Sequence, residues 1–350
     1  MKKFSDVLML CIIVMIILVP VAHFNLKPGQ ISSVENRVLA ELVPITDGAE
    51  EFMNSLDDVV NDRIGYRDQM MSFYNKVMYA GLKGNHKDVI VGDDGWLFYK
   101  EDLTTYTGNG NNPEKTEYQV RVLKAIDKWC DERGITFIFA VGPNKSTIYN
   151  NYMPDSIICT EKTQAELVAE ALEGSGVNFV YPKAEMIADR DKQELFYRLD
   201  THWNEYGARY MLDDIVDILD LPQREFVMTE DKTAGGDLIH MLGAGANGSY
   251  SVLVNVEANE GTKYDPEGYE ALEYKDFYMY TEGTEEFICY RDSFHFALLD
   301  YYSYYFHGPL YWKYDIDFDY VEQELPKYLI VSCVERNFEH AIWQNSGILG

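Results

Sequence analysis

Four short, almost continuously apolar segments constrain most strongly what this chain can fold into. They are residues 135–141, 177–181, 287–290 and 329–334. Strands of this character are typical of parallel sheets, because helices cover both faces of such a sheet. Amphipathic helices alternate with them: Pro113 and Gly134 bracket one, and Thr163 with Glu166 forms a capping box before another. The pattern predicts an α/β fold in which helices flank a parallel sheet.

One of these strands runs into Arg291-Asp292-Ser293-Phe294, which precedes a helix-like segment. A serine on a sharp strand-to-helix turn is exposed, and the first backbone N–H groups of the helix point toward whatever its hydroxyl attacks. In parallel sheets, functional sites form beyond the carboxyl ends of the strands. Ser293 is therefore a candidate nucleophile, although a helix N-cap is the commoner role for such a serine. We expect Arg291 and Asp292 to shape the turn, and Arg291 is also a candidate for contact with the oxyanion or the substrate.

A base for this serine is available upstream, in Asp200-Thr201-His202. Asp-x-His can supply a proton acceptor together with the carboxylate that orients it, although such a pair is more often solvated loop. Asn204 can cap an amphipathic helix that Pro222 stops, and this helix would hold the loop rigidly. Ser293, His202 and Asp200 are thus the candidate catalytic residues.

The two motifs together resemble a known family. Asp200-Thr201-His202-Trp203, then Gly207-Ala208, and later Arg291-Asp292-Ser293-Phe294 are similar to the SGNH-hydrolase-like proteins of the AlgX/AlgJ type and the related DHHW family. The resemblance covers nearly everything after residue 30, and the further segments that carry it are residues 33–37, 92–99, 143–145, 236–238 and 334–336. It implies an SGNH-hydrolase-like (flavodoxin-like) sheet. Plain SGNH esterases read Gly-Asp-Ser and a late Asp-x-x-His, so their oxyanion residues are not transferred here.

The resemblance also implies an activity: O-acetylation of exopolysaccharide outside the cytoplasmic membrane, through an acyl-serine. The acetyl groups would come from a membrane-bound O-acyltransferase partner, and no metal or organic cofactor is expected. Three alternatives stay open: a carbohydrate esterase or deacetylase, an inactive polysaccharide-binding scaffold, and a metal-dependent hydrolase. The last would use Asp200 and His202 with His240 or His295 as a further ligand.

Other residues are candidates for binding. The backbone N–H of Ser293 is the first expected oxyanion donor. Asn144 is a second donor or a turn residue, and Lys145 contacts substrate or pairs with an acidic neighbour. Residues 301–320 are rich in aromatic side chains, including Tyr304 and Trp312, which could stack on sugar rings or belong to the core.

Charge and the N-terminus indicate a compartment. Lys plus Arg number 30 against 58 Asp plus Glu, a net charge of −28, which excludes nucleic acid as a partner. Lys2 and Lys3 precede an apolar run over residues 7–24 that is long enough to cross a membrane, with the N-terminus cytoplasmic. A cleaved signal peptide is the rival, but Pro20-Val21-Ala22 is a poor cleavage site.

We therefore expect three parts. Residues 1–24 form a cytoplasmic tip and a transmembrane signal anchor, and residues 25–85 form a stalk and a helical segment. Residues 86–350 form the catalytic domain, with a β-containing insertion at 223–284.

Overall fold

The computed structural model describes residues 9, 14–15, 18–24, 27, 29–32, 37–70, 73, 86–242, 250–265 and 276–350. The chain divides into two compact units: Met1–Val89 with Asp237–Asn247, and Ile90–Gly236 with Gly248–Gly350. Residues 7–8, 10–13 and 16–17 of the apolar run at 7–24 lie outside the described residues, as do residues 33–36 of the segment 33–37 that carries part of the family resemblance. Among the helices that are described, none has the length and apolar character to cross a membrane.

The smaller unit contains helix α2 (Ala49–Arg63), the short pair β1 (Ile31–Ser32) and β2 (Arg37–Val38), and α10 (Asp237–Leu242). Arg63, at the end of α2, is 3% exposed and donates from Nε to the carbonyl of Ala40 at 2.6 Å. The Asp62 carboxylate accepts from the Ala40 N–H at 2.8 Å. These bonds fix the extended segment before α2.

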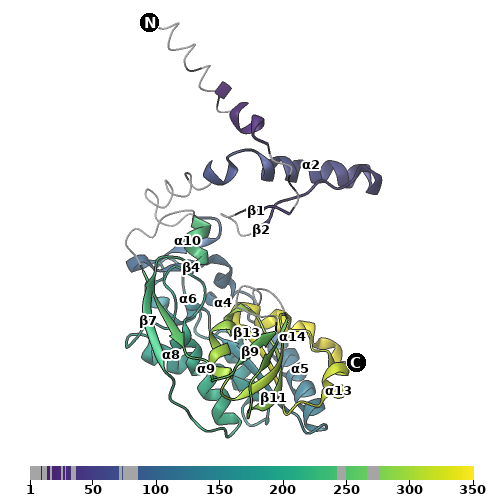
Figure 1. The fold of residues 1–350 in the computed structure, drawn as a ribbon, viewed down its shortest axis with the longest axis vertical. Coiled ribbons are helices and arrows are strands. Elements are labelled where there is room, and N and C mark those ends of the chain that lie inside the picture. The colour runs from purple at the N-terminus through teal and green to yellow at the C-terminus, as the bar shows by residue number, and fades with distance from the viewer. Residues whose placement is uncertain are drawn as a thin grey trace. The chain divides into compact units, whose positions relative to one another are not determined.

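The larger unit is built on a seven-stranded sheet with the order β6-β5-β13-β11-β12-β10-β9. Figure 1 labels its strands β9, β11 and β13. Its strands are β5 (Thr136–Gly142), β6 (Asn178–Val180), β9 (Lys263–Asp265), β10 (Phe277–Tyr280), β11 (Glu285–Tyr290), β12 (Phe306–Tyr311) and β13 (Tyr328–Val334). The first five in the spatial order are parallel, and β10 and β9 are antiparallel. The α/β class expected from the sequence, with a largely parallel sheet, is confirmed.

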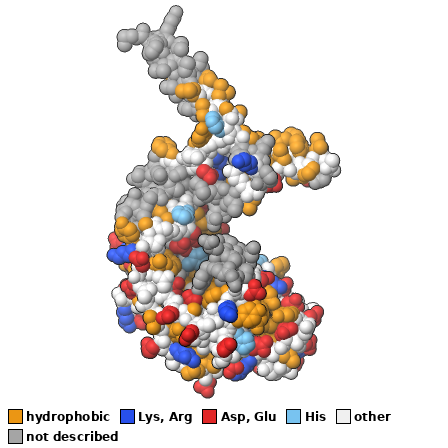
Figure 2. All heavy atoms as spheres, viewed as in Figure 1, with side chains coloured by type: hydrophobic (Ala, Val, Ile, Leu, Met, Phe, Trp, Pro, Cys, Tyr) orange, Lys and Arg blue, Asp and Glu red, His pale blue; other side chains and the backbone are white. Residues whose placement is uncertain are grey.

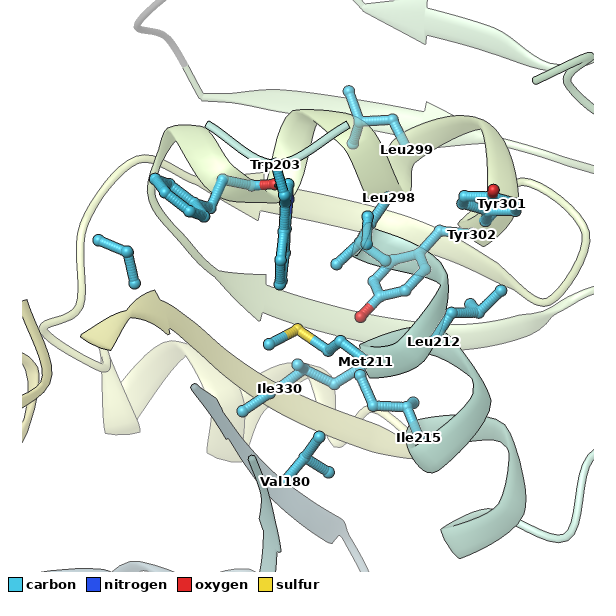
Figure 3. Packing of buried hydrophobic residues seen from close by; sticks show 14 of the residues in the cluster. Val180, Trp203, Met211, Leu212, Ile215, Leu298, Leu299, Tyr301, Tyr302 and Ile330 are labelled. Carbon is cyan, nitrogen blue, oxygen red and sulfur yellow. The ribbon is translucent and has the colours of Figure 1, made fainter. Parts of the chain in front are cut away.

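Alternate residues of the central strands face two separate cores, as the twofold side-chain period of a strand requires. Along β13, Ile330 belongs to one core while Leu329 and Val331 belong to the other. Helix α9 (Glu205–Ile218) covers the first face, and Figure 3 shows its Met211 and Ile215 against Ile330. The second face is covered by α5 (Pro113–Asp131), α7 (Gln164–Leu172), α13 (Phe318–Glu324) and α14 (Phe338–Gln344).

The expected helix starts are found where the caps predict them. Asn112 caps α5 by accepting from Glu114 N, Thr163 and Glu166 form the capping box of α7, and Asn204 accepts from Gly207 N at the start of α9. A β-hairpin of β3 (Val89–Val91) and β4 (Leu97–Tyr99) is also present. Within the described ranges, the remaining helices with printed bounds are α4 (Leu103–Tyr106), α6 (Lys145–Ile148), α8 (Lys183–Asp189) and α12 (Leu299–Tyr302), with short 3₁₀ turns at 45–47, 93–95, 100–102, 150–152, 293–298, 335–337 and 346–349.

Two features of the sheet were not foreseen. The fifth parallel strand, β12, comes from the aromatic segment 301–320, whose glycine, proline and tyrosines hide the strand pattern. Strands β9 and β10 come from residues 223–284 and extend the main sheet, so this part of the presumed insertion belongs to the core architecture. Within the same segment, β7 (Met228–Thr233) and β8 (Ser251–Val256) form a separate antiparallel pair.

Candidate active site

The segment that carries the candidate base is a small hairpin in front of α9. Phe196 and Trp203 form an antiparallel bridge, and the Tyr197 N–H donates to the His202 carbonyl at 3.1 Å. At its tip, the Asp200 carboxylate accepts from the His202 N–H at 2.9 Å. The backbone of the hairpin, together with this bond from the His202 N–H to the Asp200 carboxylate, places the two residues next to each other.

The candidate nucleophile begins the 3₁₀ turn that follows β11. Asp292 is 6% exposed and caps this turn by accepting from Phe294 N at 3.0 Å. Its second oxygen accepts from Tyr314 OH at 2.8 Å and from Val334 N at 2.7 Å, at the end of the neighbouring strand. Asp292 thus fixes the turn as the sequence suggested, through strands that are distant in the chain.

The structure brings Asp200, His202 and Ser293 together in one hydrogen-bonded chain. Asp200 Oδ1 lies 2.6 Å from His202 Nδ1, and His202 Nε2 lies 2.7 Å from Ser293 Oγ. The His202 side chain is 29% exposed, so the imidazole is reachable from solvent while Asp200 behind it is 20% exposed. This order of carboxylate, imidazole and hydroxyl is the one required for activating a serine.

Trp203 joins the hairpin to the turn at 293–298, called the nucleophile turn. Its indole N–H donates to the carbonyl of Phe294 at 2.7 Å, and its ring packs against Phe294 with a centroid distance of 5.4 Å. Gly142, at the end of β5, leaves room for this indole, since a Cβ there would lie 2.8 Å from the ring. The separation of His202 from Ser293 is therefore set by a buried contact as well as by their own hydrogen bond.

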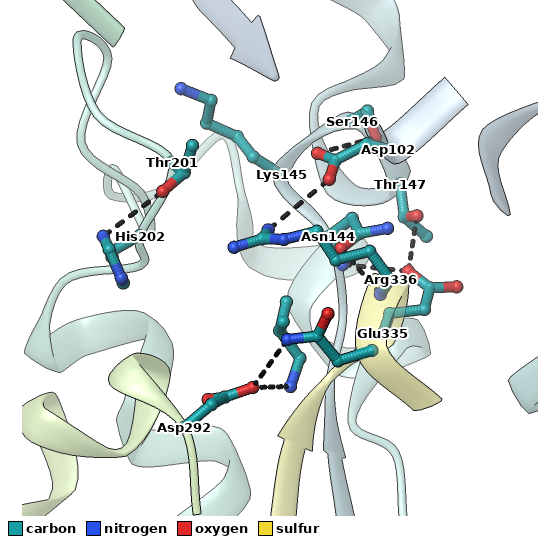
Figure 4. Close-up of polar contacts among 12 residues, drawn as sticks. Asp102, Asn144, Lys145, Ser146, Thr147, Thr201, His202, Asp292, Glu335 and Arg336 are labelled. Atoms are coloured by element: carbon teal, nitrogen blue, oxygen red, sulfur yellow. Dashed lines mark hydrogen bonds and ion pairs between the residues drawn. The ribbon is translucent and has the colours of Figure 1, made fainter. Parts of the chain in front are cut away.

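Asn144 is fully buried beyond the end of β5, near Glu335 and Arg336 (Figure 4). Its N–H donates to Glu335 Oε2 at 2.9 Å, and its side-chain oxygen accepts from Arg336 N at 3.2 Å. The amide nitrogen Nδ2 is buried and has no hydrogen-bond partner among the described residues. The backbone N–H and the side-chain oxygen of Asn144 are thus both bonded to the segment that follows β13, which favours the turn role.

Lys145, the other candidate binding residue after β5, is also in the interior. It is 1% exposed, and its ammonium donates to the backbone carbonyls of Tyr197, Arg198 and Asp200. The structure thus gives Lys145 contacts with the hairpin backbone in place of a position where substrate could meet it.

Arg336 is a site residue that sequence reasoning missed. Its guanidinium Cζ lies 5.2 Å from the centroid of the Phe294 ring, and the His202 ring lies 4.9 Å from the same ring. NH1 is 3.4 Å from Asp102, whose pKa burial raises to about 6 against the opposing effect of Arg336. In Figure 4 the Arg336 side chain extends toward the side where His202 lies. The family motif at 334–336 was the available signal.

Strand β12 runs through the aromatic segment 301–320, so the residues before it and after it lie at opposite ends of the sheet. Tyr304 precedes β12 and packs on Phe226, with its hydroxyl donating to the carbonyl of Glu257 at 2.9 Å. Trp312 follows β12, at the strand end that also bears the nucleophile turn, because Tyr311 pairs with Tyr290. Six residues of β12 separate the two ends, roughly 17 Å of extended chain. Four further aromatic residues, Tyr301, Tyr302, Tyr305 and Phe306, are buried core.

Arg291 packs among three aromatic rings instead of facing solvent. It is 1% exposed, and Cζ lies 4.5 Å from the centroid of the Phe296 ring, 4.9 Å from that of Trp312 and 5.1 Å from that of Phe277. Burial lowers the pKa of Arg291 to about 10. The backbone N–H of Arg291 donates to the Tyr311 carbonyl at 2.9 Å. This bond joins the chain just before the nucleophile turn at 293–298 to the end of β12.

His295, a candidate ligand in the metal-dependent alternative, follows Phe294 but is buried in the core. It is fully buried, with Nε2 3.7 Å from Cys289 Sγ and its ring 4.6 Å from that of Tyr302. Burial and nearby Arg291 hold the pKa of His295 well below its usual value. His240 lies on α10, in the smaller unit.

The fold and the Asp-His-Ser arrangement define an SGNH-hydrolase-like α/β protein. Residues 89–267, just over half of the chain, match the family model described as "SGNH hydrolase-like domain, acetyltransferase AlgX". The chain belongs to this family.

Relatives agree with this assignment. The "Probable alginate O-acetylase AlgJ" of Pseudomonas aeruginosa is 24% identical over 164 residues, which are 44% of this chain and 41% of that protein. The chain thus spans less than half the length of this relative. Bacillus cereus PatB1, solved with a sulfonyl adduct, matches with a TM-score of 0.54 and 14% identity over 73% of this chain and 97% of that one. A DHHW family protein from Eubacterium siraeum DSM 15702 matches with a TM-score of 0.51 and 12% identity over 74% and 98%. The two solved structures support the fold.

Proposed function

We propose that the larger unit transfers an acyl group, acetyl in the first instance, to a hydroxyl of a cell-surface or extracellular polysaccharide through an acyl-serine at Ser293. The observation that carries this proposal is the hydrogen-bonded chain from Asp200 through His202 to Ser293. Membership of the AlgX acetyltransferase family supports the choice of acetyl transfer over other reactions of an activated serine.

In the first half of the reaction, His202 accepts the Ser293 proton while Oγ attacks the acyl carbonyl. Asp200 holds the imidazole orientation and stabilises the imidazolium. The tetrahedral intermediate collapses to the acyl-serine, and His202 returns the proton to the departing oxygen. In the second half, His202 takes the proton of the acceptor sugar hydroxyl, whose oxygen attacks the acyl-serine. Ser293 leaves with its proton restored, and the acetylated sugar is released.

The oxyanion needs at least two donors, and the Ser293 N–H is the first. Asn144 Nδ2 is buried, and the Lys145 ammonium donates to backbone carbonyls of the hairpin at residues 196–203, called the base hairpin below. Arg336 is the remaining candidate near Phe294: one nitrogen faces Asp102, and 14% of the side chain is exposed. We assign the second donor to Arg336 because a guanidinium offers several N–H groups in a fixed fork.

Replacing Arg336 by Met is expected to lower kcat for an acyl ester by about 10²-fold, the cost of losing one oxyanion donor. Steady-state kinetics with a nitrophenyl acetate donor measures this. Adding Asp102→Asn removes the buried carboxylate that the first change leaves unpaired, which separates a stability effect from a chemical one. Arg133→Met is the matched control, because Arg133 also combines an ion pair, with Glu322, and a ring contact, with Trp129. A kcat for Arg336→Met within about threefold of wild type would exclude this role.

Transfer and hydrolysis are distinguished by the acceptor. A transferase keeps water slow at the acyl-serine and binds the sugar so that its hydroxyl gains from proximity. With a nitrophenyl acetate donor, a suitable oligosaccharide should therefore accelerate donor consumption and become acetylated. Trp312→Ala should reduce transfer more than background hydrolysis, because Trp312 follows β12 at the sheet edge that bears Ser293.

Tyr304→Ala is the matched control for Trp312, since Tyr304 precedes the same strand at its opposite end. Mass spectrometry of the glycan product measures transfer directly. Fast hydrolysis without an acetylated product across bacterial glycans would instead support a deacetylase. Absence of both reactions, with no labelling of Ser293, would support a polysaccharide-binding scaffold.

We also propose that the larger unit works outside the cytoplasmic membrane, tethered by residues 7–24, with a membrane-bound O-acyltransferase as its acyl donor. The support is the apolar run behind Lys2 and Lys3 and the net charge of −28, which disfavours adhesion to an anionic membrane surface. The protein should stay with membranes in high salt, and protease added to intact cells should digest it. Protection of residues beyond Gln30 in intact cells would refute this orientation.

A further inference from the structure

The tip of the base hairpin turns several backbone carbonyls toward one point. Between the bridge at Phe196 and Trp203, the chain makes a tight reversal, and the carbonyls of Tyr197, Arg198 and Asp200 all accept from the same donor. Carbonyl groups that converge in this way repel one another unless a cation lies between them.

That cation is the ammonium of Lys145. Nζ lies 3.2 Å from the Tyr197 carbonyl oxygen, 3.3 Å from that of Arg198 and 2.5 Å from that of Asp200. The side chain is 1% exposed, and Nζ also lies 5.4 Å from the centre of the Phe98 ring. An ammonium has three N–H donors, which equals the number of these carbonyls. In Figure 4 the Lys145 side chain extends away from the strand end that carries Asn144.

The lysine is itself anchored to the sheet. It is the first residue of α6, directly after Asn144 and β5, and the Asn144 N–H is held by Glu335 Oε2. Glu335 also accepts from Thr147 Oγ1 at 2.7 Å, which fixes the same short helix. The hairpin tip is thus tied through Lys145 to the end of a central strand, while Ser293 follows the end of another strand of the same sheet.

We propose that Lys145 is a positioning residue: its buried ammonium fixes the hairpin tip so that Asp200 orients His202 toward Ser293. The Asp200 backbone oxygen is held by Lys145, and its carboxylate is held by His202, so the residue is fixed at both ends. Loss of the ammonium would leave the carbonyls facing one another, and the tip would shift. This inference rests on the proposed function in taking Asp200 and His202 as the base machinery.

The test compares Lys145→Met with Lys183→Met. Lys183 is a matched control, because it also lies at the start of a helix and forms a 2.5 Å ion pair, with Glu166, away from the hairpin. The rate at which a fluorophosphonate modifies Ser293 should fall by about 10²-fold in Lys145→Met, the effect of a misplacement of about 1 Å. It should be unchanged in Lys183→Met. Lys145→Gln retains bulk and one donor group, so its rate of modification should lie between those of Lys145→Met and wild type.

A second readout does not depend on reactivity. The proton between His202 Nδ1 and Asp200 should give a downfield NMR signal in wild type, assigned by its loss in His202→Ala, and should be lost or shifted in Lys145→Met. If wild type reacts but folded Lys145→Met reacts within about threefold, the inference falls while the proposed function stands. If wild type does not react, the proposed function fails, and the NMR signal alone decides the inference: its retention in Lys145→Met overturns it. Failure of both Lys145 variants to fold would also overturn a role confined to the hairpin.

Discussion

Replacing Ser293 by Ala is expected to reduce acyl-ester turnover by about 10⁴-fold or more, because the variant has no oxygen to carry the acyl group. His202→Ala should reduce turnover by a similar factor, because His202 Nε2 lies 2.7 Å from Ser293 Oγ. In the hydrogen-bonded chain from Asp200 to Ser293, His202 is the base that takes the serine proton. The double variant should be little worse than either single one, because the two residues act as a unit.

Steady-state kinetics with an acyl ester and labelling by a fluorophosphonate measure this effect, with circular dichroism as a test of folding. Ser303→Ala is the matched control: Ser303 is buried and hydrogen-bonded to Asp300 and Asn259, but it lies at the other end of β12. Retention of more than about a tenth of wild-type activity would show that the assignment is incorrect. Such a variant would have lost less than about 1.4 kcal/mol of transition-state stabilisation.

Trp203→Ala is expected to have the largest effect on stability, a loss of about 3–5 kcal/mol in the free energy of unfolding. The indole is 1% exposed, packs against the rings of Phe196 and Phe294, and fills the space above Gly142. Its removal leaves a cavity and also leaves the Phe294 carbonyl without its donor. Since Trp203 follows His202 directly, the acyl-transfer rate of the folded fraction should fall as well.

Urea denaturation, monitored by far-UV circular dichroism so that the signal comes from the backbone and not from tryptophan, measures the free energy of unfolding. Trp203→Phe is the informative companion, because it keeps most of the volume and removes the N–H donor, with an expected cost of about 1–3 kcal/mol. Exposed Trp343 provides the control, and Trp343→Ala should change stability by less than about 0.5 kcal/mol. A loss below about 1 kcal/mol for Trp203→Ala would mean that the hairpin and the nucleophile turn are not joined through this indole.

The candidate triad could be read from the sequence because each of its parts is locally encoded. Ser293 follows an apolar strand, and Asp200 and His202 precede a helix that Asn204 caps, so both motifs stand out from their neighbours. The four strand segments and the helix starts were found for the same reason: hydrophobic period and capping depend on residues within a few positions.

The supporting residues could not be read in this way. Asn144 and Lys145 stand side by side after a strand, where an amide and an ammonium are equally suited to a substrate, a turn or the interior. The partners that decide among these roles are distant in the chain: Glu335 for Asn144, and the carbonyls of residues 197–200 for Lys145. Arg336 was passed over because residues 334–336 were noted only as part of the family resemblance, and no local pattern gives this arginine a role in the site.

The aromatic segment at 301–320 shows most clearly where sequence information ends. Its composition is equally compatible with a sugar-binding surface and with a core. Strand β12 runs through the middle of this segment. Tyr301 and Phe306 are buried at the start of the strand, whereas Trp312 follows its other end, at the sheet edge where the turn at Ser293 lies. The sequence by itself determined the α/β class, because strand and helix patterns depend on local periodicity. It also marked Ser293, Asp200 and His202 as candidates, because their two motifs stand beside a strand and a helix and together resemble those of a known family. Which polar and aromatic side chains surround that triad was decided by strand order and register, since hydrogen bonds and burial depend on partners far away in the chain.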